Sequence, residues 1–359
     1  MPGLKPCDEE KENVMHVFLT GATGFIGQRL VRVLRQRDWA VDALVRDPEA
    51  ASARWLSAQG CSLVLGDVTR ANGLREAMTG ADVLIHNAGV YELGAGASER
   101  ARMQRVNVEG TDHVLGAALA AGVPRVVYVS TVWALGDSGP GPANESQRHD
   151  GHFLTVYERS KAEAHQRALQ WRARGLPLVI AMPNAVVGAN DHSPFGYFLR
   201  LYLMGSLPPM AWGRGMVCSM VDVGALAEGI ALAAERAPVG EDYLFCGPPQ
   251  SVGEMFGHWE RHSGGLRKRV WLARWFMRSQ FLFVAPLLRA LGLPAFLSPD
   301  AVNVTRAHLN YSSAKAQRDL GWQHPDAASM WDRIVQEERR CLESRHGLRH
   351  RLRHMEVLP

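Results

Sequence analysis

The stretch TGATGFIG, Thr20–Gly27, decides the fold of this chain. It follows the apolar run Val14–Leu19 and leads directly into a helical pattern. Gly21 suits a tight strand-to-helix turn, Gly24 lets the backbone approach a pyrophosphate, and Gly27 lets the helix pack closely on the strand. The phosphates would lie at the positive end of that helix. Because a strand precedes the motif and a helix follows it, the stretch predicts a dinucleotide-binding unit rather than a glycine-rich turn that binds nothing.

Bulk composition narrows the class of protein. The chain has 359 residues, 47% of them hydrophobic, which suits one large α/β domain with a smaller attached lobe. Its net charge of +4 is small, which argues against a dedicated nucleic-acid binder. The five cysteines are scattered without metal-ligand spacing, so we expect no metal and a reducing, cytoplasmic location. Residues 1–13 are polar and acidic, which predicts a flexible N-terminal extension and no signal peptide.

Short β-rich runs alternate with longer helical patterns from Val14 onward, which predicts a parallel sheet with helices on both faces. The expected strands are Val14–Leu19, Ala40–Val45, Ser62–Leu65, Val83–Asn87, Arg125–Ser130 and Leu178–Met182. The expected helices between them are Gly27–Arg37, Ala50–Ala58, Asn72–Met78, Ala101–Ala121 and Val156–Arg174. We therefore expect a doubly wound Rossmann core over residues 14–182, with ligands at the carboxyl ends of its strands.

After Met182 the rhythm breaks, and proline, glycine and aromatic residues become dense. We interpret residues 183–340 as a smaller C-terminal substrate-binding lobe and residues 341–359 as a basic, solvated tail. Segments between about 216 and 247 are expected to return to the core. They comprise a strand at Met216–Val221, a helix at Asp222–Arg236 and a strand at Tyr243–Cys246.

The pair Tyr157 and Lys161 carries a second signal. Four-residue spacing within a helix places both side chains on one face. An ammonium beside a tyrosine favours the phenolate, which would bring the hydroxyl closer to acid–base use near neutral pH. The preceding strand ends in Ser130 and Thr131, so hydroxyl, tyrosine and lysine can converge. On spacing alone, an exposed tyrosine beside a surface lysine remains the alternative.

Several motifs together carry a family resemblance. They are TGATGFIG, Asp67 in GDVT, HNAG at His86–Gly89, VNVEGT at Val106–Thr111, VSTV at Val129–Val132 and YERSK at Tyr157–Lys161. Through them the chain resembles the extended branch of the short-chain dehydrogenase/reductase superfamily from Val14 to Trp322. The element SSAKAQRDLGW at Ser312–Trp322 resembles the end of extended members.

This resemblance implies catalytic roles. Tyr157 would transfer the proton, Lys161 would lower the pKa of Tyr157 and bind the nicotinamide ribose, and Thr131 would polarise the substrate oxygen. Ser130 is the alternative to Thr131, because related enzymes more often have serine at that place. Asn107 resembles the asparagine that supports the lysine through water, although a helix-surface amide would fit its position equally well.

The end of the second expected strand bears on the choice of cofactor. It reads ALVRDP, with Arg46 placed to meet a 2′-phosphate, so NADP(H) is favoured. NAD(H) stays open, because Asp47 would accept the ribose hydroxyls if the strand ended one residue later. Asp67 resembles the residue beside the adenine, or is simply a turn-former. The expected cofactor contacts are Gly21, Thr23, Gly24, Phe25, Ile26, Gly27, Arg46, Asp67, Val68, Asn87, Ala88, Gly89, Tyr157, Lys161, Pro183 and Val186.

Later elements bear on the substrate. MPNAVVG at Met182–Gly188 and SMVDV at Ser219–Val223 resemble elements of the extended branch, with methionine and valine at positions usually held by arginine and tyrosine. The apolar side chains available for a pocket are Tyr91, Leu93, Trp133, Met182, Phe195, Tyr197, Met216 and Met220, although some of them would serve as lobe core. Of these, the pocket is expected to use Tyr91, Trp133, Phe195 and Met216.

The apolar pocket and the VRDP ending resemble the dihydroflavonol-reductase-like and 3β-hydroxysteroid-dehydrogenase-like group. That implies an NADP(H)-dependent oxidoreductase interconverting a ketone or aldehyde and an alcohol on a bulky flavonoid-, steroid- or terpenoid-like molecule. A nucleotide-sugar epimerase or dehydratase with tightly bound NAD is one alternative. A nucleotide-sensing protein without turnover is another. The resemblance also implies a homodimer.

Residues 266–298 form an apolar and basic stretch. Arginines and a proline interrupt it, so a membrane-spanning helix is not expected. We interpret it as part of the lobe that covers the pocket, with shallow peripheral contact to a membrane as the alternative.

Overall fold

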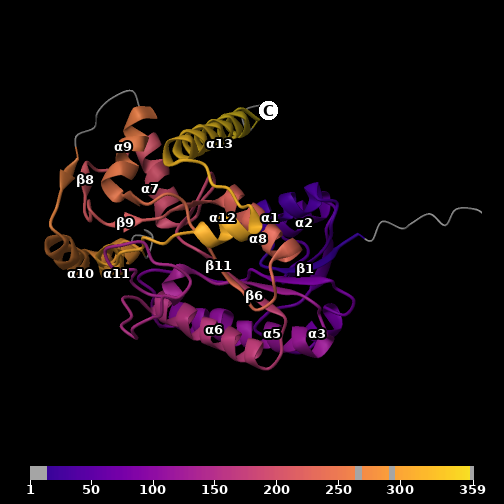
Figure 1. The fold of residues 1–359 in the computed structure, drawn as a ribbon. Helices are drawn as coiled ribbons and strands as arrows, with labels where there is room; N and C mark the ends of the chain where they lie inside the picture. The colour runs from indigo at the N-terminus through magenta and orange to yellow at the C-terminus, as the bar shows by residue number, and fades with distance from the viewer. Residues whose placement is uncertain (1–13, 263–268, 291–295, 356–359) are drawn as a thin grey trace, which may run out of the picture.

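A seven-stranded parallel sheet lies at the centre of the computed structural model, which describes residues 14–262, 269–290 and 296–355 (Figure 1). The expected extension 1–13 lies outside the described residues. The sheet order is β11-β6-β5-β4-β1-β2-β3. Its strands are β1 (His16–Thr20), β2 (Ala40–Val45), β3 (Ser62–Leu65), β4 (Val83–His86), β5 (Val126–Val129), β6 (Leu178–Pro183) and β11 (Asp242–Phe245). The chain winds outward twice from a central β1, which confirms the doubly wound Rossmann fold.

Helices cover both faces of the sheet (Figure 1). One face carries α3 (Leu74–Ala77), α5 (Gly110–Ala121) and α6 (Val156–Ala173), and the other carries α1 (Phe25–Gln36), α2 (Ala51–Ala58), α8 (Val223–Arg236) and α12 (Ala314–Leu320). Successive residues of β1 serve the two faces. Val17 and Leu19 pack with Leu30 of α1, whereas Phe18 packs with Val114 of α5. Burial on both sides explains why these strands read as continuous apolar runs.

Glycine explains one difference from the expected helices. The helix expected at Asn72–Met78 is the shorter α3, because Gly73 has a left-handed backbone with φ of 83° and ends the preceding turn.

The helix expected at Ala101–Ala121 has three parts. It comprises α4 (Ala97–Met103), a π-helical turn at Gln104–Glu109 and α5. Such turns insert one residue and re-aim the side chains around them.

The single strand expected at Met216–Val221 is instead two short strands. β9 (Val217–Cys218) pairs with β12 (Gln250–Ser251), and β10 (Val221–Asp222) pairs with β7 (Val186–Val187). The two pairings use different partners, so the segment cannot run straight.

The remaining elements form the lobe above the carboxyl ends of the strands. They are α7 (Pro194–Leu203), β8 (Met210–Ala211), α9 (Val252–His262), β13 (Val270–Trp271), α10 (Arg274–Ala290), α11 (Pro299–Asn303), a 3-10 turn at Val304–Arg306 and α13 (Ala327–Met355). Trp259 of α9 packs on Tyr202 of α7 and on Trp331 of α13, with ring centroids 5.7 Å and 5.6 Å apart.

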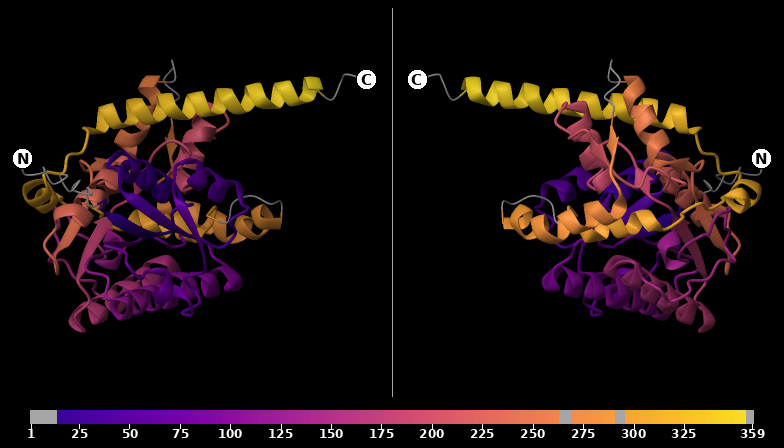
Figure 2. Two further views of the ribbon diagram at one scale, coloured as in Figure 1. Left: turned by 90° about the vertical axis from the view of Figure 1, so that its right-hand side faces the viewer. Right: turned by 90° about the vertical axis from the view of Figure 1, so that its left-hand side faces the viewer.

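The last helix, α13, reaches past the body of the molecule (Figure 2). It runs through residues 341–355 of the expected tail. None of the described helices is both long and apolar enough to cross a bilayer.

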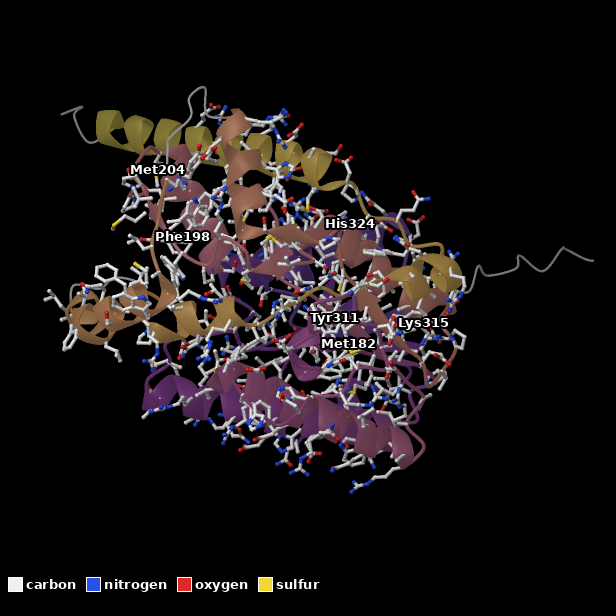
Figure 3. All side chains as sticks on the ribbon, turned by 60° about the vertical axis from the view of Figure 1, so that its left-hand side comes forward. Met182, Phe198, Met204, Tyr311, Lys315 and His324 are labelled. Carbon is white, nitrogen blue, oxygen red and sulfur yellow. The ribbon has the colours of Figure 1, made fainter. Side chains whose placement is uncertain are left out.

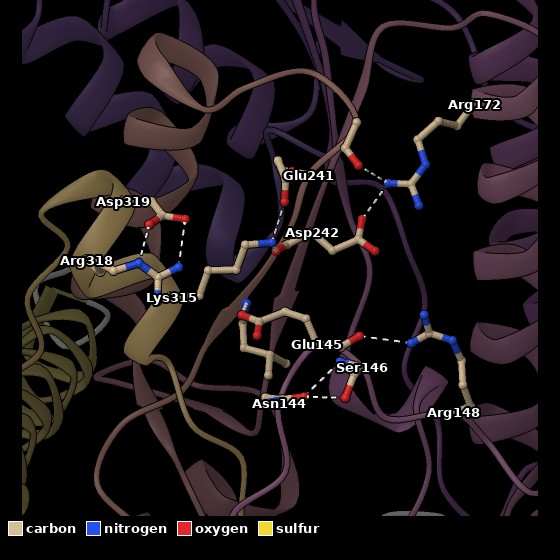
Figure 4. A network of polar contacts seen from close by, with 12 residues as sticks. Asn144, Glu145, Ser146, Arg148, Arg172, Glu241, Asp242, Lys315, Arg318 and Asp319 are labelled. Carbon is tan, nitrogen blue, oxygen red and sulfur yellow. Dashed lines mark hydrogen bonds and ion pairs between the residues drawn. The ribbon is translucent and has the colours of Figure 1, made fainter.

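Charged side chains anchor the edge strand β11, which joins the sheet long after β6 in sequence (Figure 4). Arg172 of α6 donates to the Asp242 carboxylate at 2.6 Å, and Lys315 of α12 donates to Glu241 at 2.6 Å. The backbone N–H of Leu244 donates to Glu145 at 3.1 Å. Elements from both faces of the sheet therefore hold its last strand.

Candidate active site

A cavity of about 440 Å³ opens at the carboxyl ends of the sheet strands, between the sheet and the lobe. This is the position where ligands of doubly wound sheets bind. The predicted site residues that line it are Phe25, Ile26, Asn87, Gly89, Tyr91, Ser130, Thr131, Trp133, Tyr157, Lys161, Pro183, Val186, Phe195 and Met216. Residues far apart in the sequence thus meet in one space.

Tyr157 lies in the first turn of α6, where Thr155 caps the helix by accepting a hydrogen bond from Glu158 N at 3.1 Å. Burial raises the pKa of Tyr157, the neighbouring Tyr128 raises it further, and a hydrogen bond with Thr131 lowers it. The net effect is upward, so Tyr157 keeps its proton near neutral pH. The hydroxyl is therefore held as a proton donor.

Lys161 is buried beside this tyrosine. Its Nζ donates to Val129 O at 3.3 Å and lies 5.3 Å from the centre of the Tyr128 ring. Desolvation is the largest influence on the pKa of Tyr157 and raises it. That Lys161 lowers this pKa stays a prediction.

The two strand-end hydroxyls point to different partners. Thr131 hydrogen-bonds Tyr157 and accepts from Trp133 N at 3.4 Å. Ser130 Oγ lies 3.0 Å from Nδ1 of His165, whose pKa burial lowers to about 4. Thr131 is therefore the hydroxyl that contacts Tyr157, whereas the hydroxyl of Ser130 is hydrogen-bonded to His165.

Asn107 lies in the π-helical turn and is 1% exposed, so the surface-amide alternative is wrong. Its Oδ1 accepts from Val90 N at 2.8 Å, and its Nδ2 donates to Val90 O and Ser160 Oγ, each at 3.0 Å. Ser160 Oγ in turn donates to Tyr157 O at 2.8 Å. Asn107 thus ties the loop after β4 to the helix that carries Tyr157 and Lys161. Its water-mediated support of the lysine stays a prediction.

The glycine motif forms a cradle of tightly packed backbone. A Cβ on Gly21, whose φ is 72°, would lie 2.7 Å from Ala88 N, and one on Gly27 would lie 2.1 Å from Gly21 O. A Cβ on Gly24 would meet only Gly21 O, at 3.4 Å. No side chain caps the start of α1, and its first turn carries no acidic residue. The uncapped N–H groups beside the open face of Gly24 fit a pyrophosphate.

Other predicted cofactor contacts lie around this cradle. Asn87 Nδ2 donates to Gly21 O at 3.3 Å, and Ala88 N donates to the Thr20 hydroxyl at 3.2 Å. Thr23 is half-buried and accepts from the side chain of Gln28 through its carbonyl.

Two predicted residues follow β3. Asp67 is half-buried and accepts from Thr69 N at 2.9 Å, as a turn-former does. Val68 is buried in the core under the α5 face. Neither residue is among those that line the cavity.

Arg46 follows β2 and is exposed. The neighbouring Asp47 accepts from Glu49 N at 2.9 Å, so one of its carboxylate oxygens already caps a local turn.

Half of the apolar residues proposed for the pocket line it. Leu93 and Tyr197 do not, and Met182 and Met220 are fully buried in the core instead. Figure 3 shows Met182 near the centre of the molecule. The side chain of Met182 points away because β6 is covered on both faces.

The loop after β4 carries Tyr91, whose ring edge packs on Tyr157 with centroids 4.6 Å apart. The same loop is tied to the lobe, since Gly94 N donates to Asp300 of α11 at 3.0 Å. One wall of the cavity is therefore shared by the Rossmann core and the lobe.

Asn184 lines the wall although it was not predicted to, and its signal was the motif MPNAVVG that contains it. Cys218, Val304 and Leu309 also escaped the sequence analysis. They arrive from separate segments, and no local pattern indicated them. Asp191 did have a signal, because Asn190-Asp191 precedes the helix start Ser193-Pro194. Its carboxylate accepts from Ser193 N at 2.7 Å and from Gly196 N at 3.1 Å, and burial raises its pKa.

A buried hydrogen-bonded chain lies under the site. His86 Nδ1 is 2.8 Å from the Thr20 hydroxyl, and its Nε2 is 3.1 Å from the Thr111 hydroxyl. Burial lowers the pKa of His86 to about 3, with a smaller contribution from the charge of Lys161. The imidazole is therefore neutral at physiological pH and joins the first and fourth strands to α5.

Comparison with known proteins identifies the family to which this chain belongs. Residues 17–246 match the profile of the NAD dependent epimerase/dehydratase family. The chain belongs to this family. The matched segment begins one residue into β1 and ends one residue after β11, so it includes all seven strands of the central sheet except His16.

Three relatives of this family member carry reductase or dehydrogenase names. The 4-hydroxy-2-methyl-3-oxo-4-farnesyl-3,4-dihydroquinoline-1-oxide ketoreductase of Stigmatella aurantiaca is 35% identical, over 64% of this chain and 67% of the relative. A protein named as a dihydroflavonol 4-reductase in Synechocystis sp. is 31% identical, over 85% of this chain and 89% of the relative. The 3-beta-hydroxysteroid dehydrogenase of Mycolicibacterium neoaurum is 27% identical, over 86% of each.

The crystal structure of gox2253 is similar over 90% of this chain and 98% of that chain, with a TM-score of 0.75 and 29% identity. Family membership and these relatives identify the protein as an NAD(P)-dependent oxidoreductase with a nicotinamide cofactor. They also confirm the predicted resemblance to the dihydroflavonol-reductase-like and 3β-hydroxysteroid-dehydrogenase-like group.

Proposed function

We propose that this family member interconverts a carbonyl and an alcohol on a bulky, largely apolar small molecule, using NADP(H). The observation that carries the proposal is that Thr131 and Tyr157 meet at one cavity, which Phe195 and Met216 also line. A protonated tyrosine next to a second hydroxyl is the arrangement that a carbonyl oxygen needs in order to accept a hydride and a proton.

When bound, the nicotinamide cofactor would supply or accept the hydride. The Tyr157 hydroxyl donates its proton to the substrate oxygen during reduction and takes it back during oxidation, so hydride and proton together balance the two hydrogens transferred. The Thr131 hydroxyl, held by Trp133 N, stabilises negative charge as it develops on that oxygen. Lys161 would hold the nicotinamide ribose, and the start of α1 beside Gly24 would hold the pyrophosphate.

The choice of NADP(H) rests on Arg46. Its exposed guanidinium follows the end of β2, where the adenosine ribose of a Rossmann cofactor lies, and it can form paired hydrogen bonds with a 2′-phosphate. Because Asp47 already accepts from Glu49 N, its carboxylate is less available to the ribose hydroxyls of NAD(H).

The class of substrate rests on the apolar side chains that line the cavity, which come from both the core and the lobe. Trp133, Phe195 and Met216 line a cavity of about 440 Å³, within the range of about 300–1,000 Å³ that suits a drug-sized ligand. The names of the relatives, a farnesylated quinoline ketoreductase, a dihydroflavonol reductase and a hydroxysteroid dehydrogenase, support a flavonoid-, steroid- or terpenoid-like molecule.

A fluorescence titration with NADPH and NADH tests the cofactor, and a panel of bulky ketones then tests turnover. We expect tighter binding of NADPH and loss of that preference in Arg46→Ala. In Tyr157→Phe we expect near-normal NADPH binding with turnover reduced by about 10²–10⁴-fold, the usual value of a general acid. Unchanged turnover in Tyr157→Phe would refute the mechanism. Tighter binding of NADH, or a co-purified nucleotide that does not exchange, would favour a nucleotide-sugar epimerase with bound NAD.

A further inference from the structure

The outer face of α10 is unusually apolar for a surface helix. It carries much of the large apolar surface that is exposed in the described part of the chain, contributed by Trp275, Phe276, Leu282, Phe283, Val284 and Leu287. Phe283 is 83% exposed and Trp275 is 74% exposed. Clustered exposure of this kind marks an interaction surface rather than the scattered apolar residues of an ordinary surface.

The inner face of α10 already has its partners. Met277, Phe281 and Ala285, four residues apart, are buried, and Phe281 packs on Trp212 with ring centroids 5.6 Å apart. The helix is therefore attached to the lobe by one stripe, and its second apolar stripe is left facing outward. Figure 1 shows α10 at the periphery of the molecule, beside α11.

The stretch of sequence that contains α10 carries basic residues and no acidic ones. No Asp or Glu occurs between Glu260 and Asp300, whereas Arg269, Arg274 and Arg278 lie in the described part of that segment. Arg278 is exposed on α10 itself. Arg274 donates to Thr305 O and Arg269 donates to Pro208 O, so of these three arginines Arg278 is the one that the outer face presents. Two copies of this face brought together would set Arg278 near its own copy with no carboxylate on α10 to pair with it, which disfavours a self-interface. An apolar stripe with aromatic and basic residues instead matches the headgroup region of an anionic bilayer.

We propose that the outer face of α10 docks this enzyme on the surface of an anionic lipid membrane. The helix would lie in the interface, with Trp275, Phe283 and Leu287 among the acyl chains and Arg278 among the phosphates.

The inner face of α10 links the helix to the catalytic cavity. Trp212, which contacts Phe281 of α10, also contacts Phe198 of α7 at 6.4 Å between ring centroids; Figure 3 labels Phe198 within the lobe. Arg274 donates to Thr305 O at 2.9 Å, next to Val304 of the cavity wall. Docking would therefore set the lobe side of the cavity next to the bilayer. If the proposed function holds, this is where an apolar substrate would be concentrated.

Co-sedimentation of the full chain with vesicles tests the proposal. We expect binding to an equal mixture of phosphatidylcholine and phosphatidylglycerol, weaker binding to phosphatidylcholine alone, and release by high salt. The double variant Phe283→Ser, Leu287→Ser should lower the partition coefficient by about tenfold or more. Leu65→Ser is the matched control, because Leu65 on β3 is 71% exposed and should not matter.

Arg278→Glu gives a second, independent variant, and it should reduce binding to the anionic vesicles while leaving binding to phosphatidylcholine unchanged. The affinity for NADPH, measured for each variant, shows whether the fold is intact. It also distinguishes a loss of membrane binding from a loss of the proposed catalytic function. Equal binding by wild type and the double variant would overturn the proposal. So would a wild-type dimer, seen by sedimentation without vesicles, that the double variant dissociates.

Discussion

Thr131→Val is the sharpest perturbation of the candidate site. Valine matches threonine in shape, so the change removes one hydroxyl and leaves the 6%-exposed position filled. Two hydrogen bonds are lost, the one with Tyr157 and the one accepted from Trp133 N.

The expected effect is large on turnover and small on cofactor binding. A donor aimed at a developing oxyanion contributes about 10²–10³-fold in kcat, or about 2.7–4 kcal/mol. Loss of the same hydroxyl also removes the contact that lowers the pKa of Tyr157, so its pKa should rise further. Thr131 is not part of the glycine motif that would hold the pyrophosphate, so we expect NADPH affinity to stay near that of the wild type.

Oxidation of NADPH by a bulky ketone, followed by absorbance, measures the loss. Ser130→Ala is the matched control, because Ser130 Oγ is bonded to His165 rather than to Tyr157. That variant should lose stability by about 1 kcal/mol while keeping most of its turnover. Thr131→Ser should also retain most activity, since the hydroxyl is restored. A loss in Ser130→Ala equal to that in Thr131→Val would refute the assignment of the two hydroxyls.

The three remaining predictions concern the glycine motif and the buried histidines His86 and His165. Gly27→Ala should lower stability by about 1–3 kcal/mol, because its Cβ would overlap Gly21 O, and thermal unfolding reports it. Gly24→Ala should leave the melting temperature unchanged but weaken the binding of NADPH in a titration. An equal fall of the melting temperature in both variants would contradict the different roles given to Gly24 and Gly27. Burial lowers the pKa of His86 to about 3 and that of His165 to about 4, against 6.5 in the unfolded chain. Between about pH 4 and pH 6.5, both histidines are therefore protonated in the unfolded chain and neutral in the folded protein. Stability should therefore fall as pH drops below 6.5, by roughly 3–4 kcal/mol near pH 5 in urea unfolding, whereas a flat profile would show that the histidines are not buried.

The parts of the fold that the sequence predicts are those with strong local patterns. β2 and β3 have their expected bounds, because each is a short β-rich run between two helical patterns. The lobe has no such pattern. β7 and β10 are each two residues long, which is too short for any periodicity to mark them.

The candidate site shows the same division. Tyr157 and Lys161 could be named because their spacing belongs to one helix. Leu309 could not, because it reaches the cavity wall from a segment more than a hundred residues later. The direction of the pKa shift of Tyr157 also depends on burial by the whole fold, which no local motif encodes. The boundary between the core and the lobe after residue 182 stays a prediction.

The hydrogen bond from Gly94 N to Asp300 couples the position of the lobe to the position of the catalytic tyrosine. The loop that ends in this bond also carries the ring of Tyr91 against Tyr157, so a shift of α11 is transmitted to the proton donor within a few residues. Substitutions in the lobe would then alter the rate of proton transfer as well as the fit of the substrate. Selection for a new substrate in this lobe cannot proceed independently of selection on the catalytic step.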